Sequence, residues 1–91
     1  MDAIAMTLDW ANLVGLLGSL LFISAFAYAN QAKQLDKLVF NAVNLVGAVL
    51  LLISLAVHFN LAAFALEVAW AAIALIGLVQ AIIARRKRSQ P

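Results

Sequence analysis

Glu67 is the side chain of this sequence with the clearest capacity for chemistry. The chain has 91 residues, of which six are Lys or Arg and four are Asp or Glu. Among the four acidic residues, only Glu67 lies well inside a long apolar stretch. An ionised carboxylate in apolar surroundings is unfavourable unless it is paired, hydrated or protonated. Glu67 therefore either ties neighbouring helices together through hydrogen bonds, or takes part in binding or proton coupling.

Other polar or aromatic side chains interrupt the apolar stretches and join Glu67 in a candidate site. Amides, hydroxyls, an imidazole and an indole N–H can bind a solute through hydrogen bonds, or can pair one helix with another. Both interpretations stay open for these residues. Trp70 follows Glu67 by three residues, so the two share a helical face. The candidate set consists of Tyr28, Gln31, Asn41, Asn44, Ser54, His58, Glu67 and Trp70.

Enzymatic and metal-dependent chemistry is not expected. The sequence has no pair of carboxylates at catalytic spacing, no nucleophile beside a base and no glycine-rich phosphate loop. It contains no cysteine and one histidine, His58, which cannot by itself form a multi-histidine metal site. The basic residues are not interleaved with aromatic residues, so no nucleic-acid partner is expected. We predict that the chain is not an enzyme and needs no cofactor or metal.

The composition places the candidate site in a lipid environment. Hydrophobic residues make up 67% of the chain, more than a water-soluble fold of this length can bury. Three apolar runs, at about 10–31, 38–58 and 61–84, are each long enough to cross a hydrocarbon core about 30 Å thick. The predicted fold class is all-α, a bundle of three transmembrane helices. Residues 1–91 then form a single integral membrane domain that ends in a basic tail at 85–91.

The positive charges predict the orientation of the helices. All six Lys and Arg residues lie in the connector after the first run or directly after the third run. The positive-inside rule therefore places the N-terminus outside and the C-terminus in the cytoplasm. Asp2 and Asp9 precede the first run without any positive charge, so this run is expected to be a span rather than a secretory signal. We predict a multi-pass protein of the inner (cytoplasmic) membrane.

The basic residues at 85–88 have two interpretations. They form the stop-transfer charge cluster that follows a membrane span, or they also attract anionic lipid. The second interpretation makes the lipid bilayer itself a partner of this segment.

Small residues predict where the helices pack. In lipid, helices associate through close packing and polar pairing, and small side chains let two backbones approach. At 100° per residue, Asn41, Asn44 and Ser54 fall on a polar face of the second run. Ser54 and His58 of the second run and Asn12 of the first lie at the depth of Glu67, and can donate hydrogen bonds to it. The predicted packing residues are Gly15, Ser19, Gly47 and Gly77.

A first helix that contains glycine is followed by the stretches KLVFNAVNLVGAVLLLISL and HFNLAAFALEVAWAAIALIGL. In these features the chain resembles a family of small uncharacterised bacterial three-helix membrane proteins. The resemblance covers nearly the whole chain, and it implies the fold class but no activity. It is carried by Asn44-Leu45-Val46-Gly47, Ser54, Asn60, Glu67, Trp70 and Gly77.

At longer range, the length, helix count and short turn before the third helix are similar to the SemiSWEET half-transporters and PQ-loop proteins. In those proteins three helices form one repeat, and two repeats build a translocation pathway. Their first helix carries a Pro-Gln pair, where this chain reads Tyr28-Ala29-Asn30-Gln31. The only proline here is Pro91, so no proline hinge is expected in the first helix.

Two functions are compatible with this sequence. In the first, the chain is a transporter-like half-unit that forms a parallel homodimer, with Glu67, Trp70, Asn41 and Asn44 lining a central cavity. In the second, it is an accessory subunit that packs through its small-residue faces against a larger membrane protein complex. Both predict association with the bilayer and with other membrane helices.

Overall fold

The computed structural model describes residues 9–89 and is all-helical over that range. It contains helices α2 (Trp10–Gln31), α3 (Lys37–Val57) and α4 (Leu61–Ser89). Each is long and apolar enough to cross a membrane, which indicates an integral membrane protein. The predicted all-α fold class with three long apolar helices is confirmed. Asp2 and the last two residues of the predicted basic tail lie outside the described residues.

An Asp or Asn side chain marks the start of each helix. Asp9 Oδ1 accepts a hydrogen bond from the backbone N–H of Asn12 at 2.8 Å. Asp36 caps α3 by accepting from two backbone N–H groups of its first turn. Asn60 Oδ1 accepts from the N–H of Ala63 at 3.0 Å. Capping side chains satisfy N–H groups that have no partner within the helix. These three residues therefore explain why each helix begins where it does.

Helix α4 continues beyond the apolar run. The run ends at Ala84, but the helix extends through the basic residues to Ser89. Arg and Lys are good helix formers, and positive charge is favourable near a helix C-terminus. At 1.5 Å per residue, α4 is about 43 Å long, which exceeds the hydrocarbon core by about 13 Å. The basic residues therefore have regular helical positions and form part of a defined surface.

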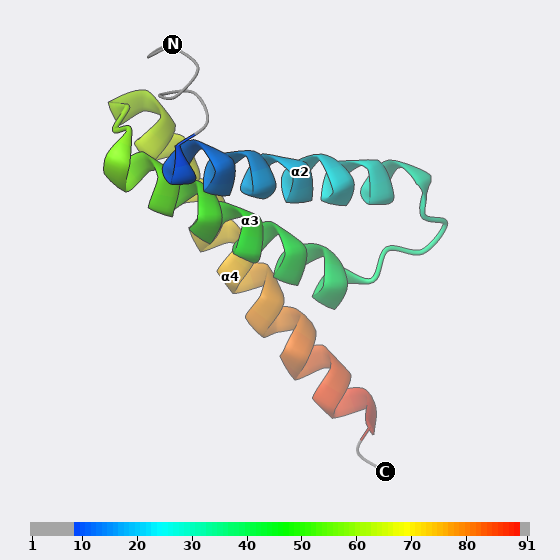
Figure 1. The fold of residues 1–91 in the computed structure, drawn as a ribbon. Coiled ribbons are helices and arrows are strands. Elements are labelled where there is room, and N and C mark those ends of the chain that lie inside the picture. The colour runs from blue at the N-terminus through cyan, green and yellow to red at the C-terminus, as the bar shows by residue number, and fades with distance from the viewer. Residues whose placement is uncertain (1–8, 90–91) are drawn as a thin grey trace.

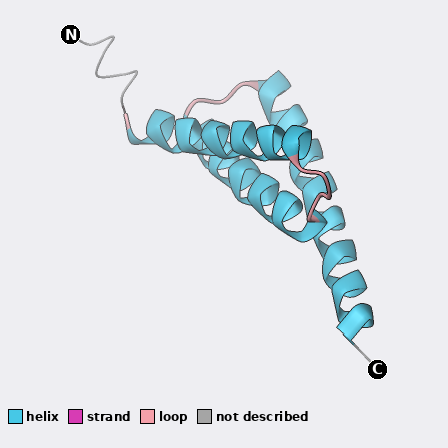
Figure 2. Cartoon of the chain, turned by 90° about the vertical axis from the view of Figure 1, so that its right-hand side faces the viewer, coloured by secondary structure: helices cyan, strands magenta, loops and turns pink. Residues whose placement is uncertain are grey.

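Helix α3 is the central element of the fold. It packs against α2 on one side and α4 on the other, and runs antiparallel to each (Figures 1 and 2). Helices α2 and α4 meet through the rings of Phe22 and Trp70, whose centroids are 5.3 Å apart. The C-terminal half of α4 extends away from α2 (Figure 1), and the molecule measures 62 × 24 × 19 Å.

The contacts between helices are made by small residues. The buried apolar residues among those described are all alanines, namely Ala11, Ala25, Ala48 and Ala74. Large apolar side chains, especially those of α2 and α4, point outward, as expected where lipid is the solvent. The buried apolar positions are therefore small, which lets the helix backbones approach closely.

The predicted packing glycines lie at helix contacts within the chain. A Cβ added at Gly15 would lie 2.7 Å from Ser54 Oγ, and one added at Gly47 would lie 2.8 Å from the Phe22 ring. A Cβ at Gly77 would lie 2.5 Å from Asn41 Oδ1. Ser19 does not bridge helices through its hydroxyl, since Oγ donates to the carbonyl of its own helix at Gly15, at 2.9 Å.

Candidate functional site

Glu67 lies in the second turn of α4 and faces α3. Only 7% of the residue is exposed, although most of the surrounding α4 residues are exposed. It borders a cavity of about 280 Å³ between α3 and α4. The other lining residues are Leu51, Ser54, Leu55, Ala63 and Leu66. The chain thus places a carboxylate in a small, largely apolar cavity.

One oxygen of Glu67 is unpartnered. Oε2 is buried and accepts no hydrogen bond from any described residue. The donors expected from the sequence at this depth, Ser54, His58 and Asn12, therefore leave this atom unsatisfied. A buried polar atom without a partner is rare and unfavourable, and more so within a bilayer. The oxygen requires a proton, a water molecule or a group beyond the described residues.

Ser54 connects the Glu67 cavity to a second one. A cavity of about 390 Å³ lies between α2 and α3, and Ser54 and Leu51 line both cavities. Its remaining lining residues are Asn12, Gly15, Leu16 and Ser19. The hydroxyl of Ser54 thus lies on the border between a cavity with a carboxylate and a cavity with polar groups from α2.

Trp70 and Asn44 form a polar link between α4 and α3. The indole Nε1 of Trp70 donates to Asn44 Oδ1 at 3.1 Å, and Asn44 Nδ2 donates to the Phe40 carbonyl at 2.9 Å. Asn44 is only 4% exposed, whereas Trp70 is 44% exposed. Both ends of the asparagine amide are engaged, so in this structure Asn44 pairs helices. Trp70 packs across the helices near the middle of the fold, one turn beyond Glu67.

Asn41 lies further along the same contact and does not line the Glu67 cavity. Its Nδ2 donates to the carbonyl of Lys37 at 2.8 Å, and its amide fills the space left by Gly77. Asn41 therefore contributes to the packing of α4 on α3, at a distance along the helix from the carboxylate.

His58 lies at the end of the fold where α2 begins and α3 ends, paired with Asp9. Its Nε2 is 2.8 Å from Asp9 Oδ2, and both side chains are partly exposed. The pKa of Asp9 is lowered, first by the hydrogen bond from the Asn12 backbone N–H and also by His58. His58 therefore joins the start of α2 to the end of α3, and it does not line the Glu67 cavity.

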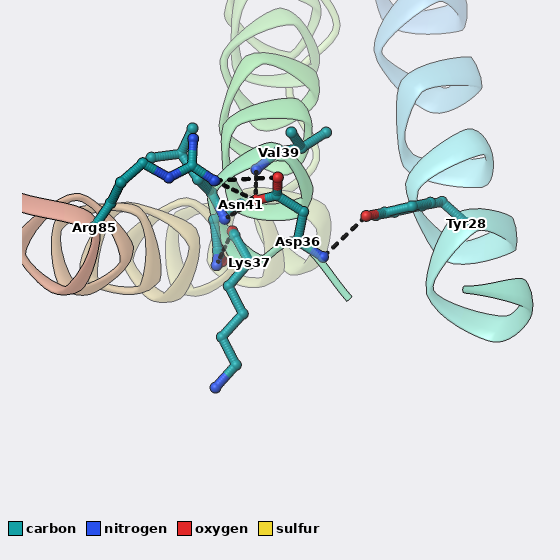
Figure 3. Close-up of polar contacts among 7 residues, drawn as sticks. Tyr28, Asp36, Lys37, Val39, Asn41 and Arg85 are labelled. Carbon is teal, nitrogen blue, oxygen red and sulfur yellow. Dashed lines mark hydrogen bonds and ion pairs between the residues drawn. The ribbon is translucent and has the colours of Figure 1, made fainter. Parts of the chain in front are cut away.

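The opposite end of the fold holds a group of three residues, which we term the inner clasp: Tyr28, Asp36 and Arg85. Sequence reasoning named Tyr28 as a candidate but missed the other two. Arg85 of α4 reaches Asp36, with its NH2 group 3.2 Å from each carboxylate oxygen. The backbone N–H of Asp36 donates to the Tyr28 hydroxyl at 2.9 Å, so all three helices meet here (Figure 3). Gln31 is exposed at the end of α2 and takes no part.

The charge pattern contained a signal for the inner clasp. Asp36 is the one carboxylate in a connector otherwise flanked by positive residues. Its pKa is lowered, first by the hydrogen bond from the Val39 backbone N–H and also by Arg85. A lone acidic residue placed to cap α3 is thus also placed to receive a basic residue from the end of α4.

Comparison with known proteins yields one match. The model of an uncharacterised protein family covers residues 11–86, a range that includes the Glu67 cavity and the inner clasp. No curated protein and no solved structure matches the chain. None of the comparisons supports the expected similarity to SemiSWEET and PQ-loop proteins.

Proposed function

We propose, on the premise that this chain belongs to the uncharacterised family whose model matches residues 11–86, that it is a transporter-like half-unit of the membrane. In this proposal Glu67 binds a proton or a small solute during passage. The observation that supports it is the buried Glu67 Oε2, which borders a cavity and has no partner among the described residues. An ionisable group inside a membrane is by default a functional-site hypothesis, and no described residue pairs with this oxygen.

The chemistry of the cavity defines what can bind. A carboxylate takes up a proton, or accepts a hydrogen bond from an N–H or O–H group. The leucine side chains that line the cavity offer apolar contact to the rest of a solute. The site therefore suits a proton or a small solute that carries a hydrogen-bond donor, and the Ser54 hydroxyl offers a second polar contact.

The pathway requires a second copy of the chain. Three helices, of which α2 and α4 pack against α3, do not enclose a pore, whereas two repeats can form a pathway near the bilayer midplane. Both copies insert with the same orientation, because the six positive charges all flank the same side. We infer an N-terminus outside, a C-terminus in the cytoplasm, and location in the inner membrane.

The alternative function is that of an accessory subunit of a larger membrane protein complex. That interpretation used the small-residue faces for contact with other proteins. Gly15, Gly47 and Gly77 instead contact neighbouring helices of the same chain. The half-unit hypothesis used the small and polar faces for contact between two copies, so this finding bears on both functions. The transporter-like function keeps the separate support of Glu67.

The test is proton flux into liposomes that contain the purified protein and an internal pH-sensitive dye. Under an imposed pH gradient and potential, we expect the wild-type protein to acidify the lumen faster than empty liposomes. Glu67→Gln should reduce the flux to the level of empty liposomes, since the amide cannot take up a proton. The matched control is Gln80→Ala, which removes an exposed polar group from the same helix and should leave the flux unchanged.

A negative result in that assay is followed by the same comparison with a panel of small amines and alcohols. Equal transport by the wild-type and Glu67→Gln proteins in every assay contradicts the proposal. Cross-linking in native membranes provides the second test, since we expect a dimer of this chain. A monomer, or a fixed stoichiometry with larger subunits, favours the accessory function.

A further inference from the structure

A cavity with a different character lies at the inner end of the fold. It has a volume of about 680 Å³ and is formed by the connector, the start of α3 and the end of α4. We term it the inner pocket. Its charged lining residues are Asp36, Lys37, Arg85, Lys87 and Arg88.

The inner pocket carries an excess of positive charge. Asp36 is engaged by Arg85, and it also accepts two backbone N–H groups at the start of α3. The two charges of this pair offset one another. No described acidic side chain pairs with Lys37, Lys87 or Arg88. Three cationic groups from two helices thus border one pocket without a counter-charge, and this arrangement attracts an anion.

Figure 3 shows the contacts of the inner clasp, two of whose residues, Asp36 and Arg85, line the inner pocket. Arg85 reaches from α4 toward the start of α3, and holds the two helix ends together through Asp36. The side chain of Lys37 extends away from these contacts (Figure 3). Arg85 is therefore occupied within the chain, whereas Lys37 remains available to a ligand.

The helical continuation of α4 places charge directly beside apolar surface. Ala81, Ala84, Arg85 and Arg88 are spaced by three and four residues, so they form one stripe along the helix. All four line the inner pocket. The facing wall includes Leu35 and Leu38. One pocket therefore offers an apolar wall toward the membrane interior and cations beyond the end of the apolar run.

We propose that the inner pocket binds the phosphate headgroup of an anionic phospholipid. Lys37, Lys87 and Arg88 contact the phosphate, and the upper acyl chains lie along the alanines and leucines. Inorganic phosphate shares the charge but has no part that uses the apolar wall. In the proposed topology the pocket lies at the headgroup level of the cytoplasmic leaflet, where anionic lipids are enriched. The site does not depend on transport by Glu67.

The test is native mass spectrometry of the full chain in detergent, titrated with phosphatidylglycerol, with phosphatidylcholine or with inorganic phosphate. The pocket variant is Lys37→Gln with Arg88→Gln. The matched control is Lys33→Gln with Arg86→Gln, which also removes two positive charges, but from residues that do not line the inner pocket. Both variants keep four of the six basic residues. The two variants therefore carry the same charge when their insertion into the membrane is compared.

We expect the wild-type and control proteins to bind phosphatidylglycerol in preference to phosphatidylcholine. The pocket variant should bind phosphatidylglycerol about tenfold more weakly than the control, equivalent to about 1.4 kcal/mol. Equal loss in the two variants, or equal binding of the two lipids, overturns the proposal. Complete displacement of the lipid by inorganic phosphate also overturns it, because the apolar wall would then contribute nothing.

A second variant tests the proposal even if the pocket variant does not fold. Ala81→Trp keeps every charge and fills the apolar part of the pocket. We expect it to weaken phosphatidylglycerol binding while far-ultraviolet circular dichroism remains that of the wild type. Undiminished lipid binding by Ala81→Trp contradicts the proposed place of the acyl chains.

Discussion

Helix α3 contacts its two neighbours in different ways. Toward α2, the backbones approach until Gly47 O lies 2.8 Å from the position of a Cβ on Gly18. Toward α4, the contact is made by side chains, such as the Asn44–Trp70 hydrogen bond, and it holds the unpartnered carboxylate of Glu67. Apart from the His58–Asp9 pair at one end, the first contact is uncharged and close, and we expect it to be the fixed part of the fold. The second leaves an unpartnered polar atom beside a cavity, where the proposed binding would act.

The largest effect is expected from a bulky residue at the α2–α3 contact. The obstacle to Gly18→Leu is the backbone carbonyl of Gly47, which cannot rotate away as a side chain can. We expect the free energy of unfolding to fall by about 3 kcal/mol, measured by circular dichroism in mixed micelles of detergent and sodium dodecyl sulfate. Ala27→Leu, at an exposed position of α2, is the control and should unfold like the wild type. Equal stability of the two variants would show that the close approach does not hold the fold.

A smaller loss is expected at the α3–α4 contact. Asn44→Leu removes the acceptor of the Trp70 indole N–H, and interhelical hydrogen bonds in membranes contribute about 1 kcal/mol. Fluorescence of Trp70 in a Trp10→Phe background should shift to shorter wavelength as the indole loses its hydrogen bond. Asn30→Leu is the control, since that amide bonds only to its own helix. An unshifted spectrum in Asn44→Leu would argue against the pairing.

The neighbouring Glu67→Gln substitution should change stability by less than about 0.5 kcal/mol. Oε2 makes no hydrogen bond that could be lost, and glutamine has nearly the same size and shape as glutamate. The same unfolding assay measures it beside Asn44→Leu. If Glu67→Gln is as destabilising as Asn44→Leu, the carboxylate ties the helices together and the comparison between the two contacts is weakened.

The smallest change is expected on acidification, at the ends of the fold where Asp9 and Asp36 lie, and the inner clasp is the end chosen for measurement. Because the pKa of Asp36 is lowered in the fold, its contribution to stability is complete above about pH 5 and is lost as the pH falls below about 4. Spin labels at Gln31 and Ile83 should then show a broader distance distribution at low pH. Labels at Leu17 and Val49, across the α2–α3 contact, should not. The chain has no cysteine, so both pairs can be introduced cleanly.

The helices were predictable from sequence, whereas their ends and partners were not. Hydropathy alone locates three spans, because lipid exposure demands long apolar runs. The third span predicted from hydropathy ends at Ala84, because hydropathy counts apolar residues only. It does not include the Arg and Lys residues that continue the helix. The polar face of α3 was also visible from periodicity.

The partners of individual polar residues depend on helix rotation, which the sequence pattern does not specify. His58 was expected near Glu67, but lies beside Asp9, because that residue caps α2 where α3 ends. Asn44 was expected to pair or to bind, but its partner Trp70 follows from the angle at which α4 crosses α3. Tyr28 meets the backbone of Asp36, a contact with no signature in the side-chain pattern.

The length of α4 makes this protein sensitive to bilayer thickness. Its apolar part, from Leu61 to Ala84, is about 36 Å long, and a hydrocarbon core of about 30 Å accommodates it only if the helix tilts. Glu67 and Arg88 lie near opposite ends of this one rigid helix. A thinner membrane would increase the tilt and move the two residues in opposite directions against α3. Membrane thickness and lipid binding at the inner pocket would then both act on the Glu67 cavity through the tilt of α4.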